Sequence, residues 1–297
     1  MSDKRTMQAD EAGTDSMSTR RGRFSMLPRP ESLSISVTDW LFRIGAGLVF
    51  GFLFAPVIVV AITSVGDSVS LSVPPAEFST RWYTEFLGDG RWQRATLNSL
   101  LAAVGTTVVA TVAGTTAALG VSNLRSRSET AVVGVAVLPL LVPGVVLGSS
   151  LLVFLGEFDL QQTYVAVIAA HTLWALPLAF SVVRASLSRL DPQLREAALD
   201  LGASPTRAFA HVVAPNIRAG LVAAALIASI VSLQEFVMTL FVSGPDTRTV
   251  PVLAWNSLRN SLDPIVSVVS TLLVGSVVVA ILLVTAIIGL ERLATDT

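Results

Sequence analysis

Long apolar runs separated by short polar segments dominate this chain from about residue 41 onward. Six of these runs reach the roughly 20 residues that a helix needs to cross a bilayer. Because backbone groups within lipid must hydrogen-bond internally, we predict that each run is a transmembrane helix. The predicted spans are residues 42–65, 95–121, 131–155, 163–183, 221–242 and 265–290. The predicted fold class is all-α, a polytopic membrane protein with six transmembrane helices.

The segment before the first run is polar and lacks a helical apolar period. We therefore predict two regions, a disordered cytoplasmic tail over residues 1–36 and a transmembrane domain over residues 37–297. A signal peptide is not expected, because the first apolar run begins too late and is too long. Hydrophobic residues make up 52% of the chain and charged residues 14%, which is typical of a membrane protein in contact with lipid.

Charge and composition exclude several classes of function. A formal net charge of -1 argues against a nucleic-acid partner, which would need a basic surface. The chain has no cysteine and only two histidines, so we expect no metal site and no cofactor. Its only lysine is Lys4, in the tail, so a phosphate-binding loop of the G-x-x-x-x-G-K-[ST] type is absent. If ATP drives this protein, another chain hydrolyses it.

The basic residues predict the orientation in the membrane. With both termini inside, fifteen of the twenty lysines and arginines fall in inner segments and five in outer ones. This N-in, C-in topology places a polar loop, about residues 184–220, in the cytoplasm. The chain is therefore predicted to cross the membrane several times.

This cytoplasmic loop contains the densest set of helix signals in the chain. Asp191 and Pro192 are typical of a helix start, and Gly202 of a helix end. A second start follows at Ser204 and Pro205. One apolar face is formed by Leu194, Ala197, Ala198 and Leu201, and a second by Phe209, Val212 and Val213, with Pro215 limiting the second helix. The pattern predicts two short helices joined by a glycine hinge, which either dock onto another protein or lie flat on the bilayer.

The same loop resembles the EAA motif of binding-protein-dependent ABC transporter permeases. The matching residues are Glu196, Ala197, Ala198, Gly202, Val212, Pro215 and Gly220. The chain departs from the motif at Ala214, where leucine is usual, and at Ala219, where proline is usual. Segments such as LPLLVPGVVLG and LQEFVMTLFVSG look like the second permease subunit of spermidine/putrescine transporters, although permeases for thiamine, iron, sulfate or phosphonate share many of them.

The resemblance implies a type I importer in the plasma membrane of a prokaryotic cell, a multi-pass protein with several partner chains. These are a dimer of ATP-binding subunits, a second permease subunit that is a homologous chain, and an external solute-binding protein. The ATPase-coupling residues would be Glu196, Ala197, Ala198, Leu201, Gly202, Phe209 and Pro215. ATP-driven closure of the ATPase dimer would move this coupling helix and switch the spans between two openings.

Three residues are candidates for the translocation pathway. Glu235 is the acidic residue placed deepest in a predicted span, and an ionisable group at membrane depth is a default functional candidate. Gln234 stands beside it, where the resemblance offers an aspartate. Trp174 would present its ring face to a cation. The alternatives are that Glu235 pairs with a neighbouring helix and that Trp174 and nearby His171 are packing residues.

Prolines and small residues indicate interrupted and closely packed spans. Pro139, Pro143 and Pro177 each remove or strain a helical hydrogen bond. The small residues Ala110, Gly114 and Ala118 recur every four residues, a pattern that fits either a contact within the chain or a subunit interface.

Two other classes of protein compete with the transporter hypothesis. An intramembrane hydrolase would need His171 to pair with Ser149 or Ser150 on the preceding span. An ion-driven secondary transporter would not need the loop at Glu196.

Overall fold

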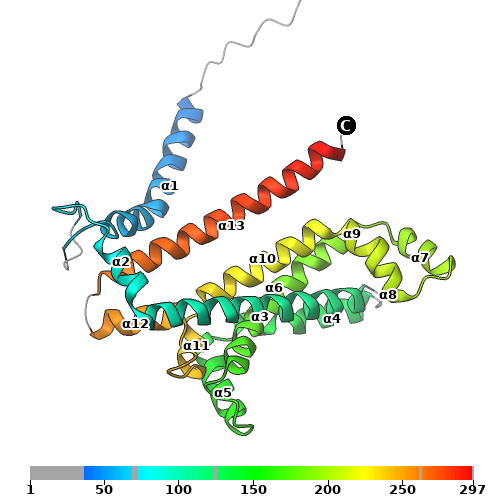
Figure 1. The fold of residues 1–297 in the computed structure, drawn as a ribbon. Coiled ribbons are helices and arrows are strands. Elements are labelled where there is room, and N and C mark those ends of the chain that lie inside the picture. Colours follow the sequence, from blue (N-terminus) through cyan, green and yellow to red (C-terminus); the bar gives the residue numbers. More distant parts are fainter. Residues whose placement is uncertain (1–36, 69–72, 123–125, 261–262, 296–297) are drawn as a thin grey trace, which may run out of the picture. The chain divides into compact units, whose positions relative to one another are not determined.

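The computed structural model describes residues 37–68, 73–122, 126–260 and 263–295. It divides the chain into two units, Met1–Gly51 and Phe52–Thr297, and the first helix runs across the boundary between them. The tail that the sequence predicts to be disordered lies outside the described residues. The described part of the chain is mostly helical and contains no strand, as Figure 1 shows, so the all-α prediction is confirmed.

Most of the helices follow one another directly or after a few residues, whereas α1 and α2 are farther apart in the sequence. In chain order they are α1 (Val37–Thr63), α2 (Arg81–Gly88), α3 (Gly90–Val121), α4 (Ser126–Val137), the 3₁₀ turn η1 (Leu138–Leu141), α5 (Gly144–Gly156), α6 (Tyr164–Leu187), α7 (Pro192–Asp200), α8 (Pro205–Ala208), the π-helical turn η2 (Phe209–Val213), α9 (Ala214–Asn216), α10 (Arg218–Gln234), α11 (Val237–Val242), α12 (Val250–Asn260) and α13 (Ile265–Thr295).

Four of these helices are long and apolar enough to cross a membrane, and two bent helix pairs raise the number to six if each pair forms one span. The four lie in α1, α3, α6 and α13, where the sequence predicts four of its six spans. α6 stays continuous through Pro177. The predicted number of spans is therefore compatible with the structure.

The third predicted span is not one straight helix. The chain bends by 95° between Ser128–Leu141 and Gly144–Gly156. Pro139 lies in the η1 turn, and Pro143 directly precedes α5. Proline has no backbone N–H and its ring clashes with the carbonyl four residues earlier, so the two prolines end one helix and start the next. A bend at this place agrees with the strain that the prolines predict.

The fifth predicted span, residues 221–242, is wrong as a single helix. α10 ends at Gln234, and α11 begins at Val237, so Glu235 and Phe236 form a break between them. Glu235 has an extended backbone with a ψ of 124°. The apolar run resumes directly after Gln234 and Glu235, so its overall hydrophobicity does not mark the break.

A core of small side chains holds α3, α6 and α10 together. Ala110 and Ala118 of α3 are fully buried in one cluster with Ala179 of α6 and Ala228 of α10. A Cβ atom on Gly114 would lie 2.9 Å from the backbone nitrogen of Phe180 in α6. The small-residue pattern of α3 therefore serves a contact within the chain, because it lets two helix backbones approach closely.

The segment before α3 is fixed by its aromatic residues. Trp82, Phe86 and Trp92 are buried against α12 and α13 in a second cluster. The indole Nε1–H of Trp82 donates to the carbonyl of Gly66 at 2.9 Å. These rings therefore mainly pack within the chain, whereas Phe78 remains 77% exposed.

Candidate functional site

The loop between α6 and α10 is built from the local signals that its sequence carries. The Asp191 side chain caps α7 by accepting a hydrogen bond from the backbone N–H of Gln193 at 2.9 Å, and Pro192 occupies the first helical position. Proline is suited to this position because its missing N–H would have no helical partner there. The predicted helix start is confirmed.

Gly202 ends α7 in a left-handed conformation with a φ of +87°. Its N–H donates to the carbonyl of Leu199 at 2.9 Å, and the N–H of Ala203 donates to the carbonyl of Ala198 at 3.0 Å. This pair of bonds is a Schellman motif, which glycine favours because it has no Cβ to oppose a positive φ. The glycine hinge predicted from the sequence is thus a fixed turn of defined geometry.

The loop has two arms: the first is α7, and the second runs through α8, η2 and α9. The second arm is distorted before it joins α10. Ser204 caps α8, and Pro205 follows at the first helical position. The chain then widens into the π turn η2, where the N–H of Ala214 donates to the carbonyl of Phe209. A widened turn relieves the clash that Pro215 would make with the carbonyl four residues earlier. The resulting helix meets α10 at a bend of 83°.

The two arms differ in how they pack. On the second arm, Val213 and Ile217 are buried in the core formed by α3, α6 and α10, and Phe209 packs against it. α7 has no buried residue, and Leu194 and Leu201 are 45% and 89% exposed. Glu196 and Ala197 are also exposed, whereas Ala198 is half-buried. The loop therefore presents α7 with an uncovered apolar face on an anchored base.

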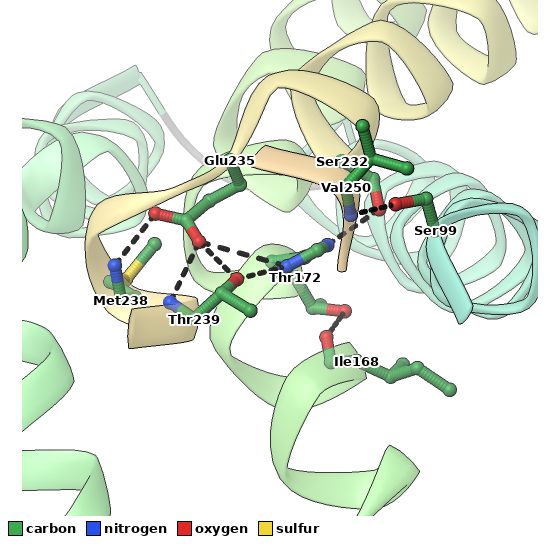
Figure 2. A network of polar contacts seen from close by, with 9 residues as sticks. Ser99, Ile168, Thr172, Ser232, Glu235, Met238, Thr239 and Val250 are labelled. Atoms are coloured by element: carbon green, nitrogen blue, oxygen red, sulfur yellow. Dashed lines mark hydrogen bonds and ion pairs between the residues drawn. The ribbon is translucent and has the colours of Figure 1, made fainter. Parts of the chain in front are cut away.

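The break between α10 and α11 contains a cluster of buried polar side chains (Figure 2). The Glu235 carboxylate accepts hydrogen bonds from the backbone N–H groups of Met238 at 2.8 Å and Thr239 at 2.9 Å, and from the Thr239 hydroxyl. Glu235 is only 4% exposed. A carboxylate in this position satisfies two N–H groups that the first turn of α11 would otherwise leave unpaired.

His171 of α6 connects the two sides of this break. Its Nε2 lies 2.6 Å from the Thr239 hydroxyl on α11, and its Nδ1 lies 2.6 Å from the Ser232 hydroxyl on α10. Because Thr239 donates its only hydroxyl hydrogen to the Glu235 carboxylate, Nε2 of His171 must carry the hydrogen that Thr239 accepts. The imidazole is fully buried, and its Nε2 lies 3.6 Å from the carboxylate.

Trp174 lies where the other broken span meets α6. Its indole Nε1–H donates to the carbonyl of Pro139 in η1 at 3.3 Å. A Cβ atom on Gly144 would lie 3.0 Å from the Trp174 ring and 3.3 Å from Val237. The breaks of the third and fifth spans therefore come together at α6, with Trp174 half-buried and Gln234 exposed at the end of α10.

Sequence analysis missed Ser232 and Thr239, which complete the cluster around Glu235. The only available signal was that both are hydroxyl residues close to an acidic residue in an apolar run. The predicted alternative of a hydrolase finds no support, because both ring nitrogens of His171 bond to Ser232 and Thr239 rather than to Ser149 or Ser150. The described residues contain no group of three or more metal-ligating acidic or histidine side chains.

Membrane-length helices, two interrupted spans and an anchored, exposed loop make up an integral membrane protein, and a sequence match gives its class. Residues 110–291 match the family of binding-protein-dependent transport system inner membrane components. This match covers more than half of the chain. The chain belongs to this family and is a permease subunit of an ABC importer, located in the inner membrane.

This chain is similar in sequence to two named polyamine permeases over most of their length. The putrescine transport system permease protein PotI of Escherichia coli K12 is 32% identical over 235 residues, which cover 77% of this chain and 83% of PotI. The spermidine/putrescine transport system permease protein PotC of the same strain is 25% identical over 225 residues, covering 76% and 85% of the two chains.

Solved structures confirm the fold. A chain of a bacterial ABC transporter involved in the import of the acidic polysaccharide alginate matches with a TM-score of 0.62 at 13% identity, over 86% of this chain and 97% of that one. A chain from the alginate transporter in complex with an alginate-bound periplasmic protein matches with a TM-score of 0.64 at 16% identity, over 84% and 94%.

Proposed function

We propose that this permease subunit imports a polyamine, putrescine or spermidine, which an external solute-binding protein delivers. The similarity to PotI carries this proposal, because it extends over most of both chains and is the stronger of the two similarities to polyamine permeases. A carboxylate held within the membrane region at Glu235 also suits a cationic solute.

The α7 arm is the proposed docking element for a dimer of ATP-binding subunits. The observation that supports it is the contrast between the two arms, since α7 exposes Leu194 and Leu201 while Val213 and Ile217 anchor the loop. Because the base of the loop is anchored in the core formed by α3, α6 and α10, a displacement of α7 by the ATP-binding subunits would be transmitted to these helices. This proposal places the loop and both chain termini in the cytoplasm, with the second permease subunit beside the spans.

The translocation pathway is proposed to pass the break between α10 and α11. Gln234 is exposed there, and Trp174 borders the junction with the third span. Glu235 is buried beside Gln234, so its carboxylate would contribute negative charge to the pathway and fix the backbone geometry of the break. Irregular backbone within a membrane is tolerated where it is buried in protein or lines a cavity.

Thiol labelling tests this pathway, because the natural chain contains no cysteine. A Gln234→Cys variant should react with a membrane-impermeant maleimide, and saturating binding protein with its solute should slow the reaction severalfold. The matched control is Met238→Cys, because Met238 lies just across the break with no exposure and should remain unlabelled. Labelling of both positions at equal rates, or no protection of Gln234→Cys by the solute, would contradict the proposed pathway.

The function as a whole is tested on the complex purified from its native membrane. We expect an ATP-binding subunit and a second permease to co-purify, and ATP-dependent uptake of radiolabelled putrescine or spermidine by proteoliposomes that contain the binding protein. A binding protein that instead takes thiamine, iron, sulfate or phosphonate would overturn the substrate alone. Uptake that survives deletion of residues 196–202 in a folded protein would overturn the coupling role and favour a secondary transporter.

A further inference from the structure

The loop that connects α11 to α12, residues 243–249, is held firmly against the first turns of α3. The Asn98 side-chain amide donates to the carbonyls of Asp246 and Arg248, both at 2.8 Å, and its oxygen accepts from the Tyr164 hydroxyl at 2.7 Å. The Ser99 hydroxyl accepts from the backbone N–H of Val250 at 2.9 Å. Asn98 is 2% exposed. These bonds make the loop a preorganised surface that needs little ordering when a partner binds.

A cavity of about 460 Å³ opens between this loop and the start of α3, and basic side chains dominate its wall. Arg91 pairs with Asp89 at 2.7 Å, and Arg94 pairs with Asp246 at 2.9 Å. The hydrogen bond from Arg91 lowers the pKa of Asp89, so this carboxylate remains ionised and matched by Arg91. Arg248 also lines the cavity and has no carboxylate within ion-pair distance among the described residues. Three of the residues that line the cavity are arginines and one is an acid, so its wall carries an excess of positive charge, while Asp263 acts on Arg91 from outside the lining.

The ion pair between Arg94 and Asp246 is open to water on both sides, whereas Asp89 in the other pair of the cavity wall is only 22% exposed. The side chains of Arg94 and Asp246 are 65% and 86% exposed, and that of Arg91 is 73% exposed. An ion pair exposed to the extent of Arg94 and Asp246 contributes little to stability, so the Arg94 guanidinium can exchange one carboxylate for another. An incoming carboxylate would meet Arg248 without an ionic partner and a second guanidinium able to bind it in a bidentate manner.

The cavity lies at the far end of α3 from the α7 arm. It is lined by α3 residues from Gly90 to Asn98, whereas Thr115 to Gly120 of the same helix line a pocket shared with Arg195 and Phe209 of the loop. The 32 residues of α3 extend about 48 Å at ~1.5 Å per residue, which exceeds the ~30 Å thickness of the hydrocarbon core. The cavity and the α7 arm therefore face opposite sides of the membrane.

We propose that this cavity receives an aspartate or glutamate side chain from the docking face of the solute-binding protein. The choice of partner rests on the proposed function, which places the solute-binding protein on the side opposite the α7 arm. The charge excess at Arg248 defines the acidic chemistry, and the anchored loop supplies a rigid contact. The site would set how fast the binding protein docks, because charges at the rim of an interface act mainly on association rates.

The test measures association of the solute-loaded binding protein with the complete transporter in nanodiscs of neutral lipid. Arg248→Glu should lower the association rate constant about tenfold at low salt, and the difference from the natural protein should shrink at ~1 M salt, where screening acts over about 3 Å. Arg248→Gln should give an intermediate loss. Unchanged gel-filtration profiles would show that both variants remain assembled.

The matched control is Arg259→Glu, because Arg259 is an exposed arginine at the end of α12 and does not line the cavity. It should change the rate constant less than twofold. Equal losses for Arg259→Glu and Arg248→Glu, or no loss for Arg248→Glu, would overturn the proposal. So would an effect that occurs only when the discs contain anionic lipid, which would assign the cavity to a lipid phosphate. A solute-binding protein that does not associate with the natural transporter at all would contradict the proposed function itself.

Discussion

Replacing His171 with leucine should destabilise the folded protein by about 2–4 kcal/mol. The change leaves the Ser232 hydroxyl without its imidazole partner and removes the donor to Thr239, and each buried polar group without a partner costs about 1–3 kcal/mol. For a domain of this size we expect the unfolding midpoint in detergent to fall by about 5–15 °C. The measurement is thermal unfolding followed by tryptophan fluorescence.

The other histidine of the chain is the control for this experiment. His211 is exposed on the loop, where its Nδ1 donates to the carbonyl of Arg207 at 3.0 Å, so His211→Leu should shift the midpoint by no more than about 1–2 °C. His171→Gln should recover part of the loss, because an amide both donates and accepts. Equal stability of His171→Leu and the natural protein would show that the cluster does not hold the break between α10 and α11.

Replacing Gly202 with proline should reduce solute uptake at least about tenfold while leaving insertion into the membrane intact. Proline fixes φ near −65°, whereas Gly202 has a φ of +87°, and proline also removes the N–H that donates to Leu199. The turn after α7 must therefore reorganise, which redirects the exposed helix. Membrane insertion is spared because α7 buries no side chain. The measurement compares uptake with the ATP hydrolysis that the binding protein stimulates in proteoliposomes.

Gly202→Asn is the matched control, because asparagine is among the few residues that adopt a left-handed conformation at modest cost. It should retain most of the uptake. If Gly202→Pro transported as well as Gly202→Asn, the geometry of this turn would be irrelevant to coupling, and the proposed docking role of α7 would be wrong.

Local chemistry explains why the loop could be predicted in detail. Asp191, Pro192 and Gly202 act on backbone groups within a few residues of themselves, so their effect does not depend on distant packing. The prolines at positions 139 and 143 mark the bend in the third span for the same reason. Predictions of this kind need only the sequence around the residue.

The break at Glu235 could not be predicted in this way. The run from residue 221 to 242 is mostly apolar, with Gln234 and Glu235 and a few hydroxyl residues as its polar members, which made a continuous span the expected result. The chain bends there because the carboxylate caps α11 and because His171, more than 60 residues earlier, bonds to both sides. A side chain that caps a helix across a break produces no repeating pattern of apolar and polar residues, so the periodicity of the sequence does not reveal it.

The sequence by itself determined the membrane class, the candidate spans and the capped loop, because these depend on hydrophobicity and on short-range backbone chemistry, and the motif in that loop indicated the family. Only the tertiary structure decided that α7 is presented while its neighbour is anchored, that two broken spans meet at α6, and that Asn98 fixes the loop beside the arginine-lined cavity. Each of these features depends on side chains that are distant in the sequence, and only the packed fold brings them within hydrogen-bonding distance.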